Sequence, residues 1–300
     1  MTTLGFVGTG TIGAPMAGRL LAAGHALEVL DANPAACAAL CDAGATLAVS
    51  LPALAARCAT VFLSLPGPAA IEAVMLGDDG LLAQPGALTT IVDLSTNALD
   101  LNRRLAEEAA ARGVAYLDAP VSGGKAAAAA GKLAVMVGGD AAAFERVRPL
   151  LDCFAAHVFH LGPAGAGTLA KLVNNQIFLA ASVLVQEGFV LGAKAGMDAN
   201  VLREVLEVSS AGPYLARAEL VLSHRYDRDL FALGIAAKDI RLALDSAAAV
   251  GAEMPLTAAA QQVYARALEL GDARDDFHAT LRALEDAAQT TVASLEPKPR

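Results

Sequence analysis

Short apolar runs alternate with longer stretches of helical periodicity through the first half of the chain. Short apolar runs bounded by Gly, Pro or Asp are typical of buried strands. Apolar positions at helical spacing follow two of these runs, over residues 12–23 and 34–43, and both stretches end at a glycine. Strands that alternate with helices predict a parallel sheet covered on both faces. The expected strands are residues 4–7, 27–30, 61–65, 91–94, 115–117 and 133–137.

Beyond residue 163 the strand pattern stops and only helical periodicity remains. A chain of 300 residues suits two domains better than one. We therefore predict an α/β fold in which residues 1–163 form an N-terminal Rossmann-type, doubly wound parallel sheet and residues 164–296 form an all-α C-terminal domain. The expected helices of the second half are residues 169–195, 199–208, 236–250, 256–270 and 277–288.

Composition narrows the class of protein. Hydrophobic residues make up 55% and charged residues 18% of the chain, which is typical of a compact globular protein. The net charge is −9 and no basic stripe appears, so we expect no nucleic-acid partner. A few local cations can still dominate a cleft, so a small anionic substrate is compatible with the acidic balance.

Targeting and redox signals point to a cytoplasmic protein. The four cysteines show no metal-ligand spacing, so we expect no metal site and reduced thiols. The first residues show no signal-peptide pattern. The apolar stretch over residues 177–185 is too short to span a bilayer and has polar flanks, so we expect no membrane association.

A glycine motif follows the first expected strand. Gly8, Gly10 and Gly13 form G-x-G-x-x-G between a strand and a helix, which is the context of a dinucleotide-binding loop. The glycines allow a tight turn, a close approach of the backbone to the pyrophosphate, and close packing of helix on strand. The helix N-terminus then offers N–H groups to the phosphates. We expect Thr11 and Ile12, within this loop, to contact the cofactor as well.

Asp31 ends the second expected strand. A carboxylate in this place accepts hydrogen bonds from the adenosine ribose and repels a 2′-phosphate. Since no arginine follows closely, we expect NAD to be preferred over NADP. The simpler alternative is that the glycines serve packing alone and that Asp31 caps the next helix.

A second glycine-rich turn precedes a lysine. The glycines at 162, 165 and 167 form a loop that opens a helix. Lys171 and Asn175 follow four residues apart, so both project from one face of that helix. A lone lysine on a helix is usually a solvated surface charge. The glycine loop and the asparagine favour a site that grips and protonates a small oxygenated substrate.

Three segments are similar to the motifs of one known family. Residues 5–17 resemble its opening signature, with Thr9 and Ile12 in place of the usual leucine and methionine. Residues 118–124 resemble its substrate-binding motif, and residues 162–175 resemble its catalytic motif. The chain thus resembles the β-hydroxyacid dehydrogenases, which include the 3-hydroxyisobutyrate dehydrogenases, over nearly its whole length.

The resemblance implies roles for five residues. Ser122 and the amides of Gly123 and Gly124 would hold the substrate carboxylate, and a hydroxyl beside turn amides is a suitable anion nest. Lys171 would be the general acid/base, and Asn175 would orient the substrate.

The resemblance also implies contacts around the nicotinamide. Lys238, followed by Asp239 as in the family, would lie at the nicotinamide end of the cleft and serve both substrate and cofactor. Residues 93–96 resemble the family's loop under the nicotinamide, whereas the next residues, 97–99, depart from the family pattern. The other expected cofactor contacts are Leu65, Pro66 and Thr96.

The function implied by the resemblance is the interconversion of a small 3-hydroxy acid, similar to 3-hydroxyisobutyrate, and its semialdehyde by hydride transfer with NAD. The alternatives are a reductase of tartronate or succinic semialdehyde, an imine-reducing relative, or a cofactor-binding protein without turnover. The base should have a pKa near the working pH, whereas free lysine titrates near 10.4. Apolar neighbours, the helix dipole and a nearby Lys238 would each lower the pKa of Lys171.

Two further features carry expectations. Lys125 stands where the family often has a small or apolar residue, and an extra cation there could favour a substrate with a second anionic group. A surface lysine is the simpler interpretation. We also expect a homo-dimer or homo-tetramer joined through the helix at 169–195, because a small helical domain leaves apolar faces to cover.

Overall fold

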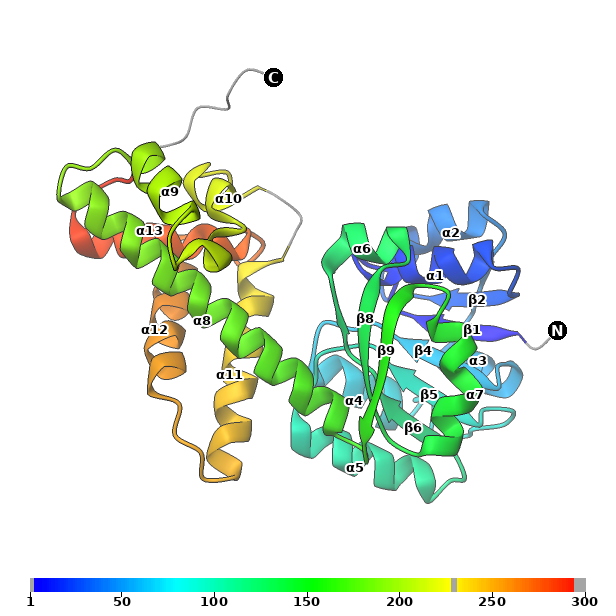
Figure 1. The fold of residues 1–300 in the computed structure, drawn as a ribbon. Coiled ribbons are helices and arrows are strands. Elements are labelled where there is room, and N and C mark those ends of the chain that lie inside the picture. The colour runs from blue at the N-terminus through cyan, green and yellow to red at the C-terminus, as the bar shows by residue number, and fades with distance from the viewer. Residues whose placement is uncertain (1–2, 228–230, 294–300) are drawn as a thin grey trace. The chain divides into compact units, whose positions relative to one another are not determined.

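The computed structural model describes residues 3–227 and 231–293 (Figure 1). The chain divides into two compact units, Met1–Leu172 and Val173–Arg300. The boundary between them falls within one long helix, α8 (Ala166–Lys194). The last residues of the predicted second domain, 294–296, lie outside the described residues.

Within the described residues, a nine-stranded sheet forms the centre of the first unit. Six strands run parallel in the order β3-β2-β1-β4-β5-β6. β8 then pairs antiparallel with β6 and β7, and β9 pairs parallel with β8. The strands are β1 (Leu4–Val7), β2 (Leu27–Leu30), β3 (Thr46–Leu47), β4 (Thr60–Leu63), β5 (Thr90–Asp93), β6 (Ala115–Asp118), β7 (Val121–Ser122), β8 (Leu133–Gly138) and β9 (Ala155–Gly162).

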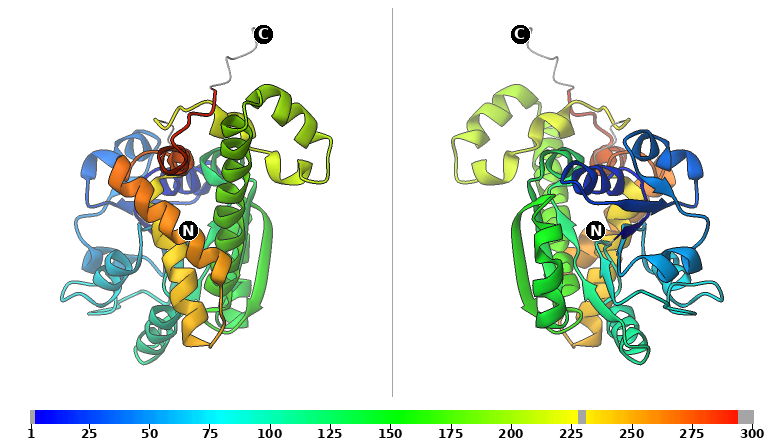
Figure 2. Two further views of the ribbon diagram at one scale, coloured as in Figure 1. Left: turned by 90° about the vertical axis from the view of Figure 1, so that its left-hand side faces the viewer. Right: turned by 90° about the vertical axis from the view of Figure 1, so that its right-hand side faces the viewer.

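Helices cover both faces of this sheet (Figures 1 and 2). Phe6 of β1 packs in one apolar cluster with α1, α2, α6 and α7, whereas the adjacent Val7 packs in a second cluster with α3, α4 and α5. The central strands β1 and β5 are buried at every position, as expected of a sheet covered on both faces, which confirms the Rossmann-type fold. The helices are α1 (Gly13–Ala22), α2 (Ala38–Asp42), α3 (Leu51–Arg57), α4 (Pro68–Leu76), α5 (Leu99–Ala110), α6 (Gly124–Ala130) and α7 (Ala141–Leu151).

The structure adds features that the apolar pattern does not reveal. β9 has mostly exposed side chains and is defined by its backbone pairing with β8, so it carries no alternating apolar signal. The sheet changes direction after β6, because β7 and α6 return the chain alongside β6 in the opposite sense. Residues 34–43 form a 3₁₀ turn, Pro34–Cys37, followed by the short α2 rather than one continuous helix.

Within its described residues, the second unit consists of helices joined by turns and loops and has no strand, apart from a single β-bridge between Ala232 and Asp276. The helical second half expected from the sequence is therefore confirmed. α12 packs against both α11 and α13 (Figure 2). After α8, the elements are α9 (Ala199–Glu207), a 3₁₀ turn (Gly212–Leu215), α10 (Ala218–Leu222), α11 (Leu233–Ala249), α12 (Pro255–Leu270), a 3₁₀ turn (Phe277–Ala279) and α13 (Thr280–Ala288).

Helix α8 contributes to two apolar clusters of the second unit. Leu179 contributes to an apolar cluster with α11 and α12, and Phe189 contributes to another with α9 and α10. By length and composition alone, the 29-residue helix α8 could cross a membrane. The apolar stretch 177–185, which forms only part of this helix, is too short to do so. The core helix of a soluble protein can have the same length and composition, so this feature assigns no membrane location.

Candidate active site

The glycine loop after β1 has the geometry of a dinucleotide-binding turn. Gly8 has φ +91°, and a Cβ there would lie 2.2 Å from the carbonyl oxygen of Ser64. A Cβ on Gly13 would lie 2.0 Å from the carbonyl oxygen of Gly8, so this glycine permits the contact of helix and strand. A Cβ on Gly10 would meet nothing within 4 Å, which leaves open space beside the backbone. The loop therefore fits a pyrophosphate at Gly10.

The first turn of α1 adds to this fit. No side chain among the described residues caps the helix at Ile12. The Ala14 amide donates to the Gly10 carbonyl oxygen, and the other amides of this turn can face an anion. Thr11 is exposed, whereas Ile12 packs partly against the core of the first unit. Any contact of Ile12 with a cofactor would therefore use its backbone.

Asp31 is tied to the glycine loop. One of its carboxylate oxygens accepts from the Thr9 amide at 2.7 Å, and the other accepts from the Asn33 amide at 2.9 Å. A carboxylate has about four acceptor positions, so capacity remains for ribose hydroxyls. The structure thus gives Asp31 a second role, that of fixing the loop, which the sequence did not indicate.

The loops after β4 and β5 are joined by a buried network. The hydroxyl oxygen of Ser95 accepts from the Leu65 amide at 2.9 Å, and the Ser95 amide donates to Asp93 at 3.0 Å. Leu65 is half-buried and packs against the core, Pro66 is exposed, and Thr96 is half-buried. The two loops that carry these three expected cofactor contacts are therefore joined by hydrogen bonds through Ser95.

Asp93 is the buried carboxyl group of this network, with 1% of its surface exposed. Burial raises the pKa of the Asp93 carboxyl from 3.8 to about 6. The Tyr116 hydroxyl lies 2.8 Å from Asp93 and 2.6 Å from the side-chain oxygen of Asn102, but it has one proton for these two acceptors. A neutral Asp93 resolves this conflict, because its O–H donates to Tyr116 while Tyr116 donates to Asn102.

Asp118, at the end of β6, holds the start of α8. One of its carboxylate oxygens accepts from the Gly165 amide and the other from the Thr168 amide, both at 2.7 Å. Thr168 also accepts a hydrogen bond from the side chain of Asn102. A Cβ on Gly167 would lie 2.1 Å from the Met136 carbonyl oxygen, so the helix start packs directly on β8.

Lys171 follows this fixed start by three residues and is half-buried. Its place on α8 is therefore set by Asp118 and by backbone packing. A rigid element under a catalytic side chain is a requirement for general acid/base chemistry, because proton transfer needs a defined distance.

The expected carboxylate site forms a nest at the start of α6. Gly123 and Gly124 have φ +134° and +74°, and no side chain among the described residues caps the helix there. Both glycines are exposed, and Ser122 before them is half-buried. Amides in this conformation converge on one point and can bind an anion. Lys125 is exposed in the first turn of the same helix.

In the second unit, Asp239 organises the expected substrate residues. It is 1% exposed and accepts from the side-chain amide of Asn175 at 2.6 Å. Its other oxygen lies 2.7 Å from the Lys238 ammonium, in an ion pair that is not aligned as a hydrogen bond. Asn174 donates to the Asn175 oxygen at 3.0 Å. The Asn175 amide is therefore held from both ends.

Asp239 is a candidate positioning residue to which the sequence motif assigned no role. The signal was present, because Asp239 follows directly on Lys238 in a family motif. What the sequence lacked was the contact with Asn175, which lies on a different helix.

The expected residues thus gather in two groups. In the first unit, the glycine loop, Asp31, the loops at 65–66 and 93–96 and the residues after β6 all follow the carboxyl ends of parallel strands, where ligands bind in open α/β sheets. In the second unit, Asn175 and Lys238 share Asp239.

The chain is similar to known families and to individual known proteins. Residues 3–162 match the family description "NAD binding domain of 6-phosphogluconate dehydrogenase", and residues 165–284 match "NAD-binding of NADP-dependent 3-hydroxyisobutyrate dehydrogenase". The NAD-dependent L-serine dehydrogenase of Pseudomonas aeruginosa is 39% identical, over 92% of this chain and 96% of its own. The 2-hydroxy-3-oxopropionate reductase of Escherichia coli is 33% identical, over 97% of this chain and 99% of its own.

A solved structure agrees with these matches. The 3-hydroxyisobutyrate dehydrogenase of Mycobacterium tuberculosis with L-serine superposes with a TM-score of 0.84 at 33% identity, covering 95% of this chain and 99% of that one. The chain belongs to the β-hydroxyacid dehydrogenase family. As a member of this family it is an NAD(P)-dependent oxidoreductase, and the resemblance predicted from its motifs is confirmed.

The different surroundings of Gly10 and Gly13 predict different effects of substitution, on cofactor binding at Gly10 and on folding at Gly13. In this family member, Gly10→Ala should fold with an unchanged melting temperature and bind NAD about tenfold more weakly or worse, because its methyl fills the space beside the pyrophosphate. Gly13→Ala should instead lower the melting temperature, because its Cβ overlaps the Gly8 carbonyl. Calorimetric titration and thermal unfolding measure the two effects. Normal NAD binding by Gly10→Ala would contradict the assignment.

Burial of Asp93 should make stability depend on pH. The folded protein keeps this proton up to about pH 6, while the unfolded chain releases it near 3.8. The contribution of Asp93 to the free energy of unfolding should therefore be largest below about pH 4 and decrease by about 3 kcal/mol between pH 4 and 6. Asp93→Asn, which mimics the neutral acid, should lack this contribution, so its stability should decline less than that of the wild-type protein over the same range. Denaturant unfolding of both proteins from pH 4 to 7 tests it, and parallel pH profiles would refute it.

Proposed function

We propose that the protein is an NAD-dependent dehydrogenase that interconverts a small 3-hydroxy acid, similar to 3-hydroxyisobutyrate, and its semialdehyde. The observation that carries the proposal is the position of Lys171 on a helix whose start is fixed by the buried Asp118. Relatives named for L-serine and for 2-hydroxy-3-oxopropionate support a substrate of this size.

Different residues bind the carboxylate and the reacting oxygen of the substrate. Ser122 with the amides of Gly123 and Gly124 binds the carboxylate, because a hydroxyl and a nest of amides neutralise it without a buried cation. Asn175 gives one amide hydrogen to Asp239 and keeps a second for the substrate oxygen. Asp239 therefore acts as a positioning residue for Asn175.

Lys171 handles the proton. In oxidation, the neutral amine takes the hydroxyl proton; in reduction, the ammonium returns it to the carbonyl oxygen. The bound nicotinamide supplies the hydride acceptor or donor.

The reduction of a semialdehyde is a second candidate for the physiological direction. The similarity to the E. coli 2-hydroxy-3-oxopropionate reductase favours it. The same residues serve both directions, because microscopic reversibility only exchanges the acid and base forms of Lys171. Rates of oxidation and of reduction, measured on one panel of hydroxy acids and semialdehydes, distinguish a dehydrogenase from a semialdehyde reductase.

Asp31 supports NAD as the preferred cofactor. Its carboxylate faces the glycine loop and would repel a 2′-phosphate.

Removal of Lys171 should abolish turnover but not cofactor binding. Lys171→Ala should lower kcat by about 10²- to 10⁴-fold with NAD affinity unchanged, because only proton transfer is lost. Lys171→Arg should also fail in oxidation, because a guanidinium stays charged. Lys132→Ala, at an exposed lysine of the same unit, is the matched control and should keep full activity. Turnover near the wild-type rate in Lys171→Ala would remove this lysine from the mechanism.

Neutralising Asp31 should relax the cofactor preference. Asp31→Asn keeps a side-chain oxygen for the Thr9 amide but removes the charge, so the ratio of kcat/KM with NAD to that with NADP should fall roughly tenfold or more. Asp31→Ala should in addition weaken binding of both cofactors, because it releases the loop. An unchanged ratio in Asp31→Asn would show that this charge does not set the preference.

A further inference from the structure

A chain of buried polar side chains joins the loop after β5 to the start of α8. Asn97 lies in that loop, Asn102 lies on α5 and Thr168 lies on α8, and all three are fully buried. The amide nitrogen of Asn97 donates to the side-chain oxygen of Asn102 at 2.5 Å, and the nitrogen of Asn102 donates to the Thr168 hydroxyl. The Thr168 side chain in turn hydrogen-bonds to Asp118. All of these residues belong to the first unit.

Asn102 is the junction of this chain, because the two polar atoms of its side chain have different partners. Its oxygen accepts from Asn97 and also from the Tyr116 hydroxyl at 2.6 Å, whereas its nitrogen donates to Thr168. Only an amide can make both kinds of contact, since a carboxylate cannot donate and an apolar side chain can do neither. Because buried polar groups are tolerated only when they are paired, this pairing specifies one geometry for the loop and the helix start.

The two ends of the chain adjoin residues of the proposed function. Asn97 directly follows Thr96, which is an expected cofactor contact. Thr168 precedes Lys171 by three residues, within one turn of α8. The distance from the loop to the start of the helix therefore passes through two hydrogen bonds of Asn102.

We propose that Asn102 is a positioning residue that sets the place of Lys171 relative to the loop expected under the nicotinamide. The inference rests on the proposed function and deepens it. Asp118 fixes the start of α8 to the sheet, and Asn102 adds the link to the loop. The proton and the hydride leave neighbouring atoms of one substrate, so a small error in this distance slows the reaction without weakening binding.

Thr168→Val tests this link, because it keeps the shape of the side chain and removes the hydroxyl. In the oxidation of 3-hydroxyisobutyrate with NAD, kcat should fall by about 10- to 100-fold, while KM for either reactant changes less than about twofold. The ratio of kcat in H₂O to kcat in D₂O should rise, because proton transfer becomes the slower step. A loss of folded protein would lower kcat but leave this ratio unchanged. Thr168→Ser, which restores the hydroxyl, should recover kcat.

Asn97→Ala breaks the same chain at its other end, where neither α8 nor Asp118 is touched. It should also lower kcat and raise the isotope ratio. The double variant of Asn97→Ala with Thr168→Val should lose less than the product of the two single losses, because either change breaks one shared link. A loss equal to that product, or an unchanged kcat in either single variant, would overturn the proposal.

Thr280→Val is the matched control. Thr280 is also a fully buried threonine, and its hydroxyl donates to Gln186 in the second unit. This variant should lower the melting temperature as Thr168→Val does but keep kcat, and an equal fall in kcat would contradict a positioning role for Asn102.

The Lys171→Ala background separates the two proposals. There, Thr168→Val should not reduce the residual rate further, because the link acts through Lys171. A further fall of the same size would show that Asn102 does not act through this lysine. Turnover near the wild-type rate in Lys171→Ala alone, or no turnover of 3-hydroxyisobutyrate by the wild-type protein, would instead reject the proposed function.

Discussion

The buried carboxylate of Asp118 is the contact on which the candidate active site depends. It ends the last strand of the parallel part of the sheet and accepts two amides at the start of α8. Without it, these amides would be buried donors with no partner in the first turn of a long helix, which is costly in free energy. The same contact sets the register of α8 against the sheet, and Lys171 takes its place from that register. Burial raises the pKa of Asp118, so the protein accepts an electrostatic penalty to fix one helix start.

A second buried network does the same for the cofactor loops. Asp93, Ser95, Tyr116 and Asn102 link the loops after β4 and β5 to α5, and Asn102 extends the network to Thr168 in α8. Polar groups in a core are usually tolerated only when each is paired. Here the pairing connects the loop expected at the nicotinamide with the helix that carries the proposed acid/base. The family motifs in this region therefore combine residues for chemistry with residues that hold them.

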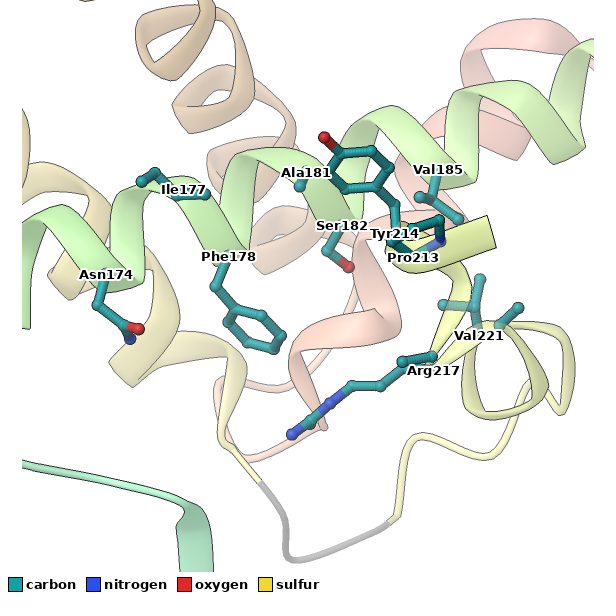
Figure 3. A pocket seen from close by; sticks show the side chains of 12 residues that line it. Asn174, Ile177, Phe178, Ala181, Ser182, Val185, Pro213, Tyr214, Arg217 and Val221 are labelled. Carbon is teal, nitrogen blue, oxygen red and sulfur yellow. The ribbon is translucent and has the colours of Figure 1, made fainter. Parts of the chain in front are cut away.

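In the second unit, a buried carboxylate also fixes a candidate site residue, here between two helices. Asp239 on α11 accepts a hydrogen bond from Asn175 on α8, so a buried carboxylate orients the amide that the proposed function assigns to the substrate oxygen. Further along α8, a cavity of about 340 Å³ opens between this helix and Arg217 (Figure 3). Within the second unit, α8 therefore carries both the amide held by Asp239 and one wall of this cavity.

The sequence by itself determined much of this protein. Continuous apolar runs identified the central strands, because strands buried on both faces must be apolar, and the glycine motif identified the cofactor loop, because its glycines are required sterically. The apolar pattern did not predict β9, because most of its side chains are exposed and its backbone hydrogen bonds with β8 define it. Only the tertiary structure decided the roles of Asp118 and Asp239, the second role of Asp31 and the cavity at Arg217. Each depends on groups that lie apart in the sequence, and residue spacing reports neighbours along one element but not the partners that packing brings against it.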